Sequence, residues 1–227
     1  MPLTGAGAKR KKSSPSPARG FARNVFINCP FDDPYLPILR PVIFCVLHLG
    51  FRPRIALERL NSGEARIAKI IQLIRESRFA IHDLSRLQAE RQGEYYRLNM
   101  PFELGLDVGC ALFGARPWQS KKCLILETER YRYQAALSDL SNSDIAVHGN
   151  DPQRAMTEVR NWLAVEAGLP DAPGPAAVWD RFTDFTADHF TDLNARGYSK
   201  ADISAQPISE LLPAMEAWTR RQRTRGE

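Results

Sequence analysis

The stretch "NSGEARIAKIIQLIRESRFAIHDLSR", residues 61–86, predicts a helix followed by a strand. Isoleucines in its first part recur at i, i+3, i+4 and i+7, the spacing of one helix face: Ile67, Ile70, Ile71 and Ile74. We expect that stripe to pack on a sheet, with Asn61 and Glu64 forming a capping box at the start of the helix. The second part, "FAIHDLSR", is a short apolar run that ends in polar residues, which is typical of a buried strand entering a loop.

The same alternation of strand and helix extends in both directions. Further strands are expected in four short runs: "NVFINC" (24–29), "FRPRIALE" (51–58), "KKCLILET" (121–128) and "DIAVHG" (144–149). Helices are expected from Asp33 and Pro34 to about Leu49, with a bend at Pro41, from about residue 99 to Gly114, and over 152–168. Apolar strands that alternate with helices indicate an α/β fold: a doubly wound, mostly parallel five-stranded sheet, flavodoxin-like, in the order 2-1-3-4-5.

The chain divides into three parts on composition. Residues 1–20 are rich in Gly, Ser, Pro, Ala and Lys and are expected to be a disordered basic tail. Residues 21–170 hold the α/β domain. Residues 171–227 read as an α-helical appendix of two helices, "PAAVWDRFTDFTADHFTDLNARG" and "ISELLPAMEAWTRRQ". We expect this appendix either to dock on the sheet domain or to form a partner surface, such as a homo-oligomer contact.

Composition excludes several classes of protein. The 227 residues carry a formal charge of +5, much of it in "KRKK" (9–12) and "RRQRTR" (220–225), which we interpret as solvated tails. Nucleic acid is expected to make only weak contact, through these tails. No apolar run is long enough to span a membrane, and none follows the basic N-terminus as in a secretory signal. The four cysteines form no CxxC pair, as expected for reduced thiols in a cytoplasmic protein. No metal-ligand cluster or Gly-rich phosphate loop is visible, so no cofactor or metal is expected.

Topology predicts where a site would lie. In a sheet of this order, ligands bind at the carboxyl ends of strands one and three, where the strand order reverses. The segments that follow those strands are "NCPFDDPY" (28–35) and "HDLSR" (82–86), and the helix near residue 99 begins at the same edge. These segments supply polar side chains, which are Asn28, Asp32, Asp33, His82, Asp83, Ser85, Arg86, Asn99 and Glu103.

Glu103 draws attention because its helix is otherwise nearly all apolar. In the helix expected from about residue 99 to Gly114, which begins within "RLNMPFELGL" (97–106), only Asp107 is also charged. An acid near a helix N-terminus is favoured by the helix dipole, by about 0.3–1 kcal/mol, so Glu103 could serve the helix only. A carboxylate held among apolar side chains at a pocket mouth is, however, a candidate functional group.

Three motifs together resemble the nucleoside 2-deoxyribosyltransferase-like and TIR-like superfamily: "VFINCPFD" (25–32), "AIHDLSR" (80–86) and "NMPFELGL" (99–106). The resemblance covers about residues 24–130 and implies a flavodoxin-like N-glycosidase fold. It implies that Glu103 is the catalytic glutamate, that Asp83 is the strand-three acid, and that Phe31 and Asp32 wall the base or ribose. Where the deoxyribosyltransferases often place an Asp that holds the base, this chain has Arg97, so cleavage of NAD or another nucleotide stands beside nucleoside transfer.

Topology and resemblance together define the candidate site. Glu103 and Asp83 are expected to be catalytic, with Asp83 or His82 as the nearest proton donor. The candidates for substrate contact are Asn28, Cys29, Phe31, Asp32, Ser85, Arg86, Asn99 and Phe102. Arg66, Arg86 and Arg97 could meet phosphates, although Arg66 reads first as an exposed helix residue.

Three functions stay open on the sequence. The first is cleavage or transfer of an N-glycosidic bond on a nucleoside, nucleotide or NAD through a carboxylate under the ribose. The second is a non-catalytic nucleotide sensor that signals through the C-terminal helices, and the third is a TIR-like self-association module. For a TIR-like enzyme that cleaves NAD, family analogy implies a bacterial defence role.

Overall fold

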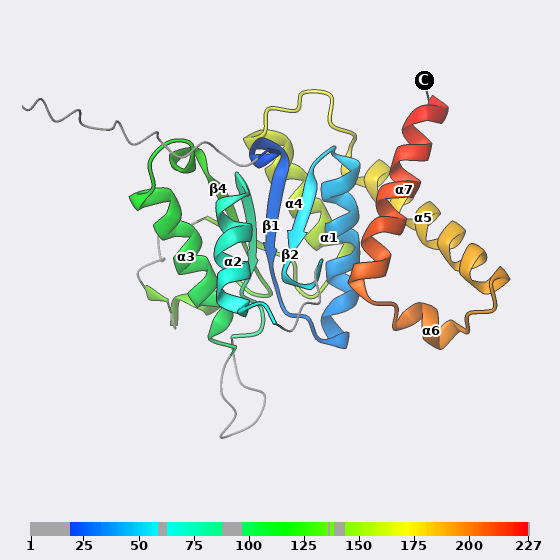
Figure 1. The fold of residues 1–227 in the computed structure, drawn as a ribbon, viewed down its shortest axis with the longest axis horizontal. Coiled ribbons are helices and arrows are strands. Elements are labelled where there is room, and N and C mark those ends of the chain that lie inside the picture. Colours follow the sequence, from blue (N-terminus) through cyan, green and yellow to red (C-terminus); the bar gives the residue numbers. More distant parts are fainter. Residues whose placement is uncertain (1–18, 59–62, 88–96, 136, 139–143, 227) are drawn as a thin grey trace, which may run out of the picture.

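A wholly parallel sheet of five strands lies at the centre of the molecule, in the order β2-β1-β3-β4-β5 (Figure 1). The strands are β1 (Asn24–Asn28), β2 (Arg52–Ile55), β3 (Phe79–Asp83), β4 (Lys122–Glu127) and β5 (Ile145–Val147). This order confirms the predicted doubly wound, flavodoxin-like architecture. The structure is a computed structural model, and it describes residues 19–58, 63–87, 97–135, 137–138 and 144–226. The expected tail (1–20) lies almost wholly outside these residues, and Asn61 does so too.

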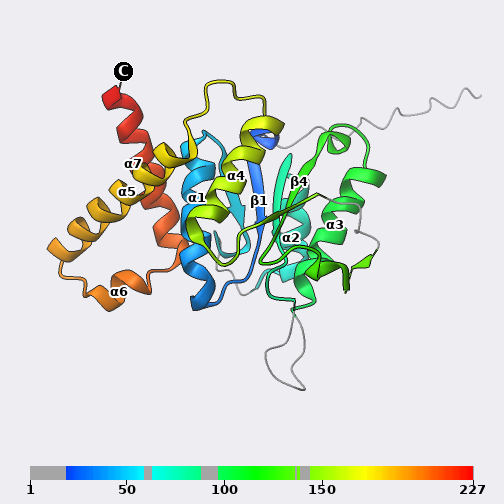
Figure 2. The same cartoon turned by 180° about the vertical axis from the view of Figure 1, so that it is seen from behind.

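Helices cover both faces of the sheet (Figures 1 and 2). On one face lie α1 (Leu36–His48) and α4 (Pro152–Glu166), and on the other α2 (Arg66–Arg75) and α3 (Asn99–Phe113). Strand residues alternate between the two faces: Ile27 and Ile81 join the core under α1 and α4, whereas Phe26 and Ala80 pack with α2. Short 3-10 turns link the elements: η1 (Phe21–Arg23), η2 (Asp33–Tyr35), η3 (Ala56–Glu58), η4 (Trp118–Ser120) and η5 (Arg132–Ala135).

The entry into α1 differs from the predicted one. The side chain of Asp32, not Asp33, caps the chain here, because its Oδ1 accepts a hydrogen bond from the backbone N–H of Tyr35 at 3.1 Å. The resulting 3-10 turn η2 precedes the helix, which starts only at Leu36 and continues through Pro41 as one element. Of the candidate residues, Asp32 is therefore the N-cap of this turn, and Phe31 directly precedes it.

The predicted stripe on α2 is only half right. Ile70 and Ile74 are buried, with 1% and 2% of their surfaces exposed, but Ile67 and Ile71 are 45% and 40% exposed. Leu73 is fully buried where Ile71 was expected to be, so Ile70, Leu73 and Ile74 form the buried face of the helix. The helix also begins later than expected, at Arg66, with Ala65 as N-cap, and the expected capping box includes Asn61, which lies outside the described residues.

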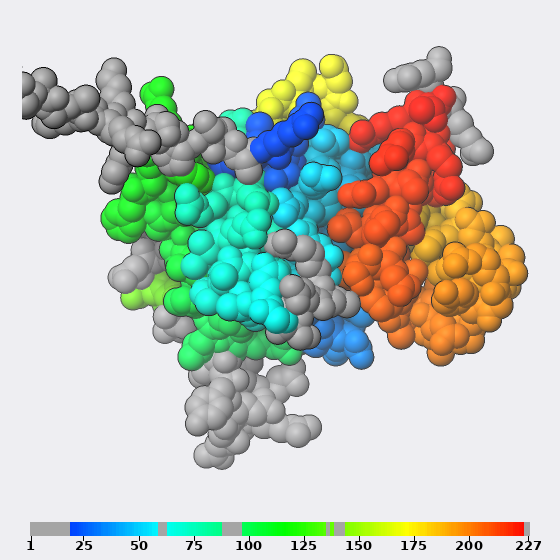
Figure 3. Space-filling model, in the orientation of Figure 1, coloured from blue at the N-terminus to red at the C-terminus, as the bar shows by residue number. Residues whose placement is uncertain are grey.

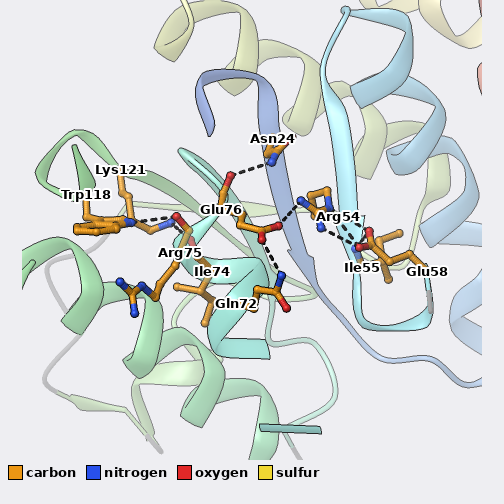
Figure 4. A network of polar contacts seen from close by, with 10 residues as sticks. All are labelled: Asn24, Arg54, Ile55, Glu58, Gln72, Ile74, Arg75, Glu76, Trp118 and Lys121. Atoms are coloured by element: carbon orange, nitrogen blue, oxygen red, sulfur yellow. Dashed lines mark hydrogen bonds and ion pairs between the residues drawn. The ribbon is translucent and has the colours of Figure 1, made fainter. Parts of the chain in front are cut away.

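The far end of α2 is fixed by a network of polar side chains (Figure 4). Its last carbonyl groups, which have no partner within the helix, accept hydrogen bonds from Lys121, Trp118 and Asn24. Lys121 donates to the carbonyl oxygen of Ile74 at 2.9 Å and also to that of Ser77. A cation at a helix C-terminus is favoured by the helix dipole, so this network stabilises the end of α2 that lies away from the candidate site.

Three helices follow the sheet domain: α5 (Pro175–Ala195), α6 (Lys200–Ser204) and α7 (Ile208–Gly226). They form a lobe beside α1 (Figure 3). Phe185 of α5 and Trp218 of α7 pack on Phe44 of α1, with ring centroids 5.8 Å apart in each pair. Because these residues share one hydrophobic cluster with β1, β3 and α4, the C-terminal helices are docked on the sheet domain.

The basic segment 220–225 is exposed at Arg220, Arg221 and Arg223, as we expected, but it does not form a tail. It continues α7, and the guanidinium of Arg223 donates to the carbonyl oxygens of Leu47 and His48 at 3.0 and 3.1 Å. These are carbonyls of the last turn of α1, where a cation is favoured. No described helix combines the length and the apolar character needed to cross a membrane.

Candidate functional site

Polar side chains line the carboxyl edge of the sheet, the lower edge in Figure 1. Asn28 ends β1, Asp83 ends β3 after His82, Glu127 ends β4, and His148 follows β5. All five residues are almost fully buried, with at most 1% of their surfaces exposed. Polar groups are buried at a cost unless they are bonded to one another or serve a ligand, so each of them needs a partner or a role.

Asn28 fastens α3 to the edge of the sheet. Its Nδ2 donates to the backbone carbonyl of Met100 at 2.9 Å and lies 3.1 Å from Nδ1 of His82. The first contact fixes the first turn of α3 against β1, and the second links β1 to β3. Asn28 therefore positions the helix that carries Glu103, in addition to lying at the predicted edge.

Asp83 is fully engaged by its neighbours. Oδ2 accepts a hydrogen bond from the Tyr35 hydroxyl at 2.5 Å and lies 3.2 Å from Nε2 of His148, while Oδ1 accepts from the backbone N–H of Ser85 at 2.8 Å. Nδ1 of His148 accepts from the N–H of Asn150, so its Nε2 carries the proton that faces Asp83. Burial by itself would raise the pKa of Asp83, but His148, Ser85 and Tyr35 lower it below its ordinary value. Asp83 is thus held as a carboxylate.

Asp107, one turn beyond Glu103 on α3, is also engaged. Lys121 Nζ lies 2.9 Å from its Oδ1, and His82 Nε2 lies 3.4 Å from its Oδ2. Burial opposes ionisation, but the hydrogen bond and charge of His82 and the charge of Lys121 lower the pKa of Asp107. The two histidines of the edge are therefore each matched to a carboxylate, His148 to Asp83 and His82 to Asp107.

Glu103 differs from both aspartates. It is 5% exposed, and the nearest cation among the described residues is the Arg66 guanidinium, 3.9 Å from its Oε1. Burial raises the pKa of Glu103 from 4.5 to about 7, while Arg66 opposes the rise. Glu103 also lies beyond the first turn of α3, which holds no acidic residue, so the helix dipole gives it little support.

Several predicted residues gather around this glutamate. Burial raises the pKa of the Cys29 thiol well above its ordinary value, and the negative charges of Asp83, Glu103 and Asp32 raise it further, so these carboxylates surround the thiol. Phe31 is half-buried and packs between the cores on the two faces of the sheet.

The remaining predicted residues differ in burial and in their partners. Asp32 is paired with Arg97 at 2.7 Å. Arg97, which stands where the deoxyribosyltransferases often have an Asp, therefore has a carboxylate partner. Ser85 is buried and its hydroxyl makes no hydrogen bond within the described structure, whereas Arg86 is half-buried and does interact with a neighbour. Asn99 and Phe102 point to solvent, and Phe102 is 57% exposed.

Sequence reasoning missed five residues at or near this edge, namely Tyr35, Asp107, Glu127, Arg132 and His148, and it also missed Lys121, which pairs with Asp107 from the amino end of β4. Glu127 accepts a hydrogen bond from Arg132 at 2.5 Å, and Arg132 also donates to the carbonyl oxygen of Ser85. Glu127 and His148 could have been found, because each follows an apolar strand just as Asp83 does. Tyr35 and Lys121 carry no such signal, since only the fold brings them to a carboxylate.

Other features of the molecule bear on the choice of chemistry. No group of metal-binding side chains occurs among the residues that the structure describes. A cavity of about 840 Å³ lies at the C-terminal helices, and neither Glu103 nor Asp83 lines it. Comparison of the chain with protein-family models, with curated proteins and with solved structures finds no match.

Proposed function

We propose that this protein cleaves or transfers the N-glycosidic bond of a nucleoside, nucleotide or NAD, with Glu103 as the catalytic carboxylate. In such a reaction, the bond between C1′ and the base breaks and its electron pair leaves with the base. The ribose then carries positive charge at C1′, which a carboxylate beneath the ring stabilises or captures as a glycosyl-enzyme. Water or a second base completes the reaction.

The observation that carries the proposal is the weak ion pairing of the buried Glu103 among the described residues. Of the three buried carboxylates on β3 and α3, Asp83 and Asp107 each have close polar partners, whereas the ion-pair partner of Glu103 in the described part of the chain is a guanidinium at 3.9 Å. Burying a carboxylate without hydrogen bonds costs stability. A buried acid with a raised pKa at the carboxyl edge of a doubly wound sheet is a strong candidate for a reacting group.

The state of Asp83 favours a particular leaving group. Its oxygens are occupied by Tyr35, His148 and Ser85, and its pKa is lowered, so it is poorly suited to give a proton to a departing base. Nicotinamide departs neutral from its pyridinium form and needs no proton. Among the substrates proposed, NAD therefore suits this site best, and Asp83 serves as a positioning residue for Tyr35 and His148.

The start of α2 offers a place for phosphate. Arg66 is its first residue, and the N-cap residue Ala65 makes no side-chain hydrogen bond to the helix. The N–H groups of a first helical turn, the helix dipole and a guanidinium together favour an anion. Because Arg66 also lies 3.9 Å from Glu103, a nucleotide phosphate held here would bring its ribose near that carboxylate.

A second candidate is a nucleotide-binding sensor at the same site. The engagement of Asp83 favours it, because a site without a free proton donor binds most nucleosides without cleaving them. Turnover separates the two functions, since a sensor is stabilised by its ligand but releases no base.

The test compares turnover of NAD and of a nucleoside panel by the wild type, Glu103→Gln and Glu129→Gln. Glu129 is an exposed glutamate outside the site and is the matched control. We expect Glu103→Gln to lose about 10²–10³ in kcat, because a preorganised charge of this kind contributes that much. Release of nicotinamide or free base at an equal rate by Glu103→Gln would exclude the catalytic role.

The pH profile gives an independent check. Since the carboxylate form is the active one and the pKa of Glu103 is about 7, kcat/KM should rise with pH and reach half its maximum near that value. The charge of Arg66 lowers this pKa, so Arg66→Gln should move the midpoint to higher pH. An activity that falls as pH rises through neutrality would contradict an ionised Glu103.

A further inference from the structure

A second site lies between α1 and the C-terminal helices, apart from the residues that surround Glu103. The structure has a cavity of about 840 Å³ here, bounded by α1, α5, α6 and α7. Figures 1 and 2 place α6 at the same end of the molecule as the first turn of α1. Cavities of this volume are within the range that binds drug-sized molecules.

The walls of this cavity are mainly apolar and aromatic. α5 contributes a row of rings at helical spacing, Trp179, Phe182 and Phe190, and Leu36 of α1 and Met215 of α7 face them across the cavity. Phe190 keeps 40% of its surface exposed, which is unusual for a ring beside so much apolar surface. The occupant must therefore have an apolar body of its own.

One cation in the wall has no matching acid. Arg40 of α1 donates one hydrogen bond, from Nη2 to the backbone carbonyl of Ser204 in α6 at 2.7 Å. Its Nε is buried and has no hydrogen-bond partner in the described structure. Burial lowers the pKa of Arg40, and no described carboxylate forms an ion pair with its half-buried guanidinium. Half-buried guanidinium groups are normally paired, and this one lines the cavity, where it could pair with an anion.

The other polar groups of the cavity wall also favour an anionic ligand. Lys200 of α6 adds a second cation, and His189 is bonded to Gln206 at 2.7 Å. Asp33 is the one acidic residue of the lining, and it is exposed at the start of η2. The lining thus has two cations, one of them partly desolvated, against one solvated acid.

We propose that this cavity binds a small molecule with an apolar body and a single carboxylate, such as a fatty acid, with the carboxylate on Arg40. A planar guanidinium matches a carboxylate with two parallel hydrogen bonds. The apolar rings and Met215 would bury the body of the ligand. This site does not depend on the reaction proposed for Glu103, because the two share no residue.

The test measures binding of dodecanoate and of its methyl ester by calorimetry, below the concentration at which either forms micelles. The acid should bind the wild type at least about tenfold more tightly than the ester, because charge-assisted hydrogen bonds contribute that much. Arg40→Gln should abolish this preference and leave ester binding unchanged, whereas Arg40→Lys should keep part of it. Arg181→Gln is the matched control, since Arg181 is an exposed arginine of α5 outside the cavity that pairs with Asp184.

A second variant locates the apolar part of the ligand. Ala201 lines the cavity from α6, so Ala201→Trp should fill it and weaken both ligands by a similar factor, whereas Ala187→Trp on the exposed face of α5 should weaken neither. Thermal melts would verify that each variant is folded. Equal affinity of the wild type for acid and ester, no binding of either, or an undiminished preference for the acid in folded Arg40→Gln would each overturn the proposal.

Discussion

Two carboxylates one helical turn apart on α3 have opposite electrostatic surroundings. Asp107 is ion-paired with Lys121 at 2.9 Å, and its pKa is lowered. Among the described residues, the ion-pair partner of Glu103 is the exposed Arg66 at 3.9 Å, and the pKa of Glu103 is raised to about 7. Stability by itself favours the first arrangement and disfavours the second. The ionised form of Asp107 therefore supports the fold, whereas the ionised form of Glu103 weakens it.

This contrast predicts that Glu103→Gln stabilises the protein at alkaline pH. A carboxyl whose pKa is raised on folding binds a proton between about 4.5 and 7 that the unfolded chain has released. Stability therefore falls as pH rises through that window, by roughly 1–3 kcal/mol for a shift of this size. Gln does not ionise, so denaturant unfolding should show the variant more stable than the wild type at about pH 8 and nearly equal at about pH 4.5. A variant less stable at both pH values would contradict an unsatisfied Glu103.

Asp107→Asn should have the opposite effect. Removing this charge leaves the buried ammonium of Lys121 without its partner, which costs about 3–5 kcal/mol at neutral pH. Because the pKa of Asp107 is lowered in the folded protein, its contribution is present above the unfolded pKa and is lost as pH falls through the folded pKa. The penalty, measured by urea unfolding, should therefore shrink toward low pH. A penalty that stays constant down to acid pH would show that volume or hydrogen bonding, not charge, decides it.

At the scale of single elements, α3 departs from the usual pattern, in which a helix buries apolar side chains and exposes charged ones. It buries Glu103 and Asp107 and exposes Phe102, Leu112 and Phe113, of which Phe113 is 90% exposed. The sequence shows two acids in an apolar helix, which suggested burial of the whole helix. The acids face the sheet because Asn28 binds the backbone of α3 at Met100, and His82 and Lys121 pair with Asp107, and these partners come from other elements.

The α2 face can be tested in the same way. Ile70 is 1% exposed and packs with Phe26 and Leu73, whereas Ile71 is 40% exposed. Ile70→Ala should cost roughly 2–5 kcal/mol of unfolding free energy, because it leaves a cavity in the core. Ile71→Ala, the same change one residue away, should cost less than about 1 kcal/mol. Equal costs would mean that Ile71 is covered in solution.

The sequence predicted elements better than it predicted their faces. Strands β1 and β3 and helix α4 follow from apolar runs and helical spacing, and the sheet order follows from their alternation. The prediction for α2 was half wrong because the four isoleucines are compatible with more than one buried helix face. The face that is buried is the one that also contains Leu73. The charge of the segment 220–225 correctly suggested exposure to solvent, but it did not show that the segment is helical or that Arg223 binds carbonyl oxygens of α1.

The same limit applies to the candidate site. The position of Asn28 and Asp83 at one edge follows from topology, which the sequence could supply. Asp83 contacts the side chains of Tyr35 and His148, which lie 48 and 65 positions away along the chain. No pattern in the sequence indicates that these two side chains meet Asp83 and not Glu103. The sequence therefore suggested a catalytic role for both acids, whereas their surroundings in the structure differ.

At the scale of the whole molecule, the C-terminal helices complete the core of the sheet domain. Val178, Phe185, Met215 and Trp218 are buried in one cluster with residues of β1, β3, α1 and α4. Trp218 is further fixed by its indole N–H, which donates to Asp188 at 2.8 Å. A helical lobe joined through a continuous apolar core is expected to unfold together with the sheet and not as a separate unit.

Phe185→Ala tests that coupling. The ring is 3% exposed and contacts both Phe44 and Trp218, so its removal should cost about 3–5 kcal/mol. The matched control is Phe190→Ala on the same helix, where 40% of the ring is exposed and the cost should be smaller. Hydrogen exchange distinguishes the alternatives: with one cooperative core, amides of β3 lose protection in parallel with amides of α7. Loss confined to α5, α6 and α7 would mean that the lobe opens by itself. Parallel loss would mean that any ligand held between α1 and the lobe stabilises the sheet edge that carries Glu103, since a ligand that binds only the folded state stabilises every part that unfolds with it.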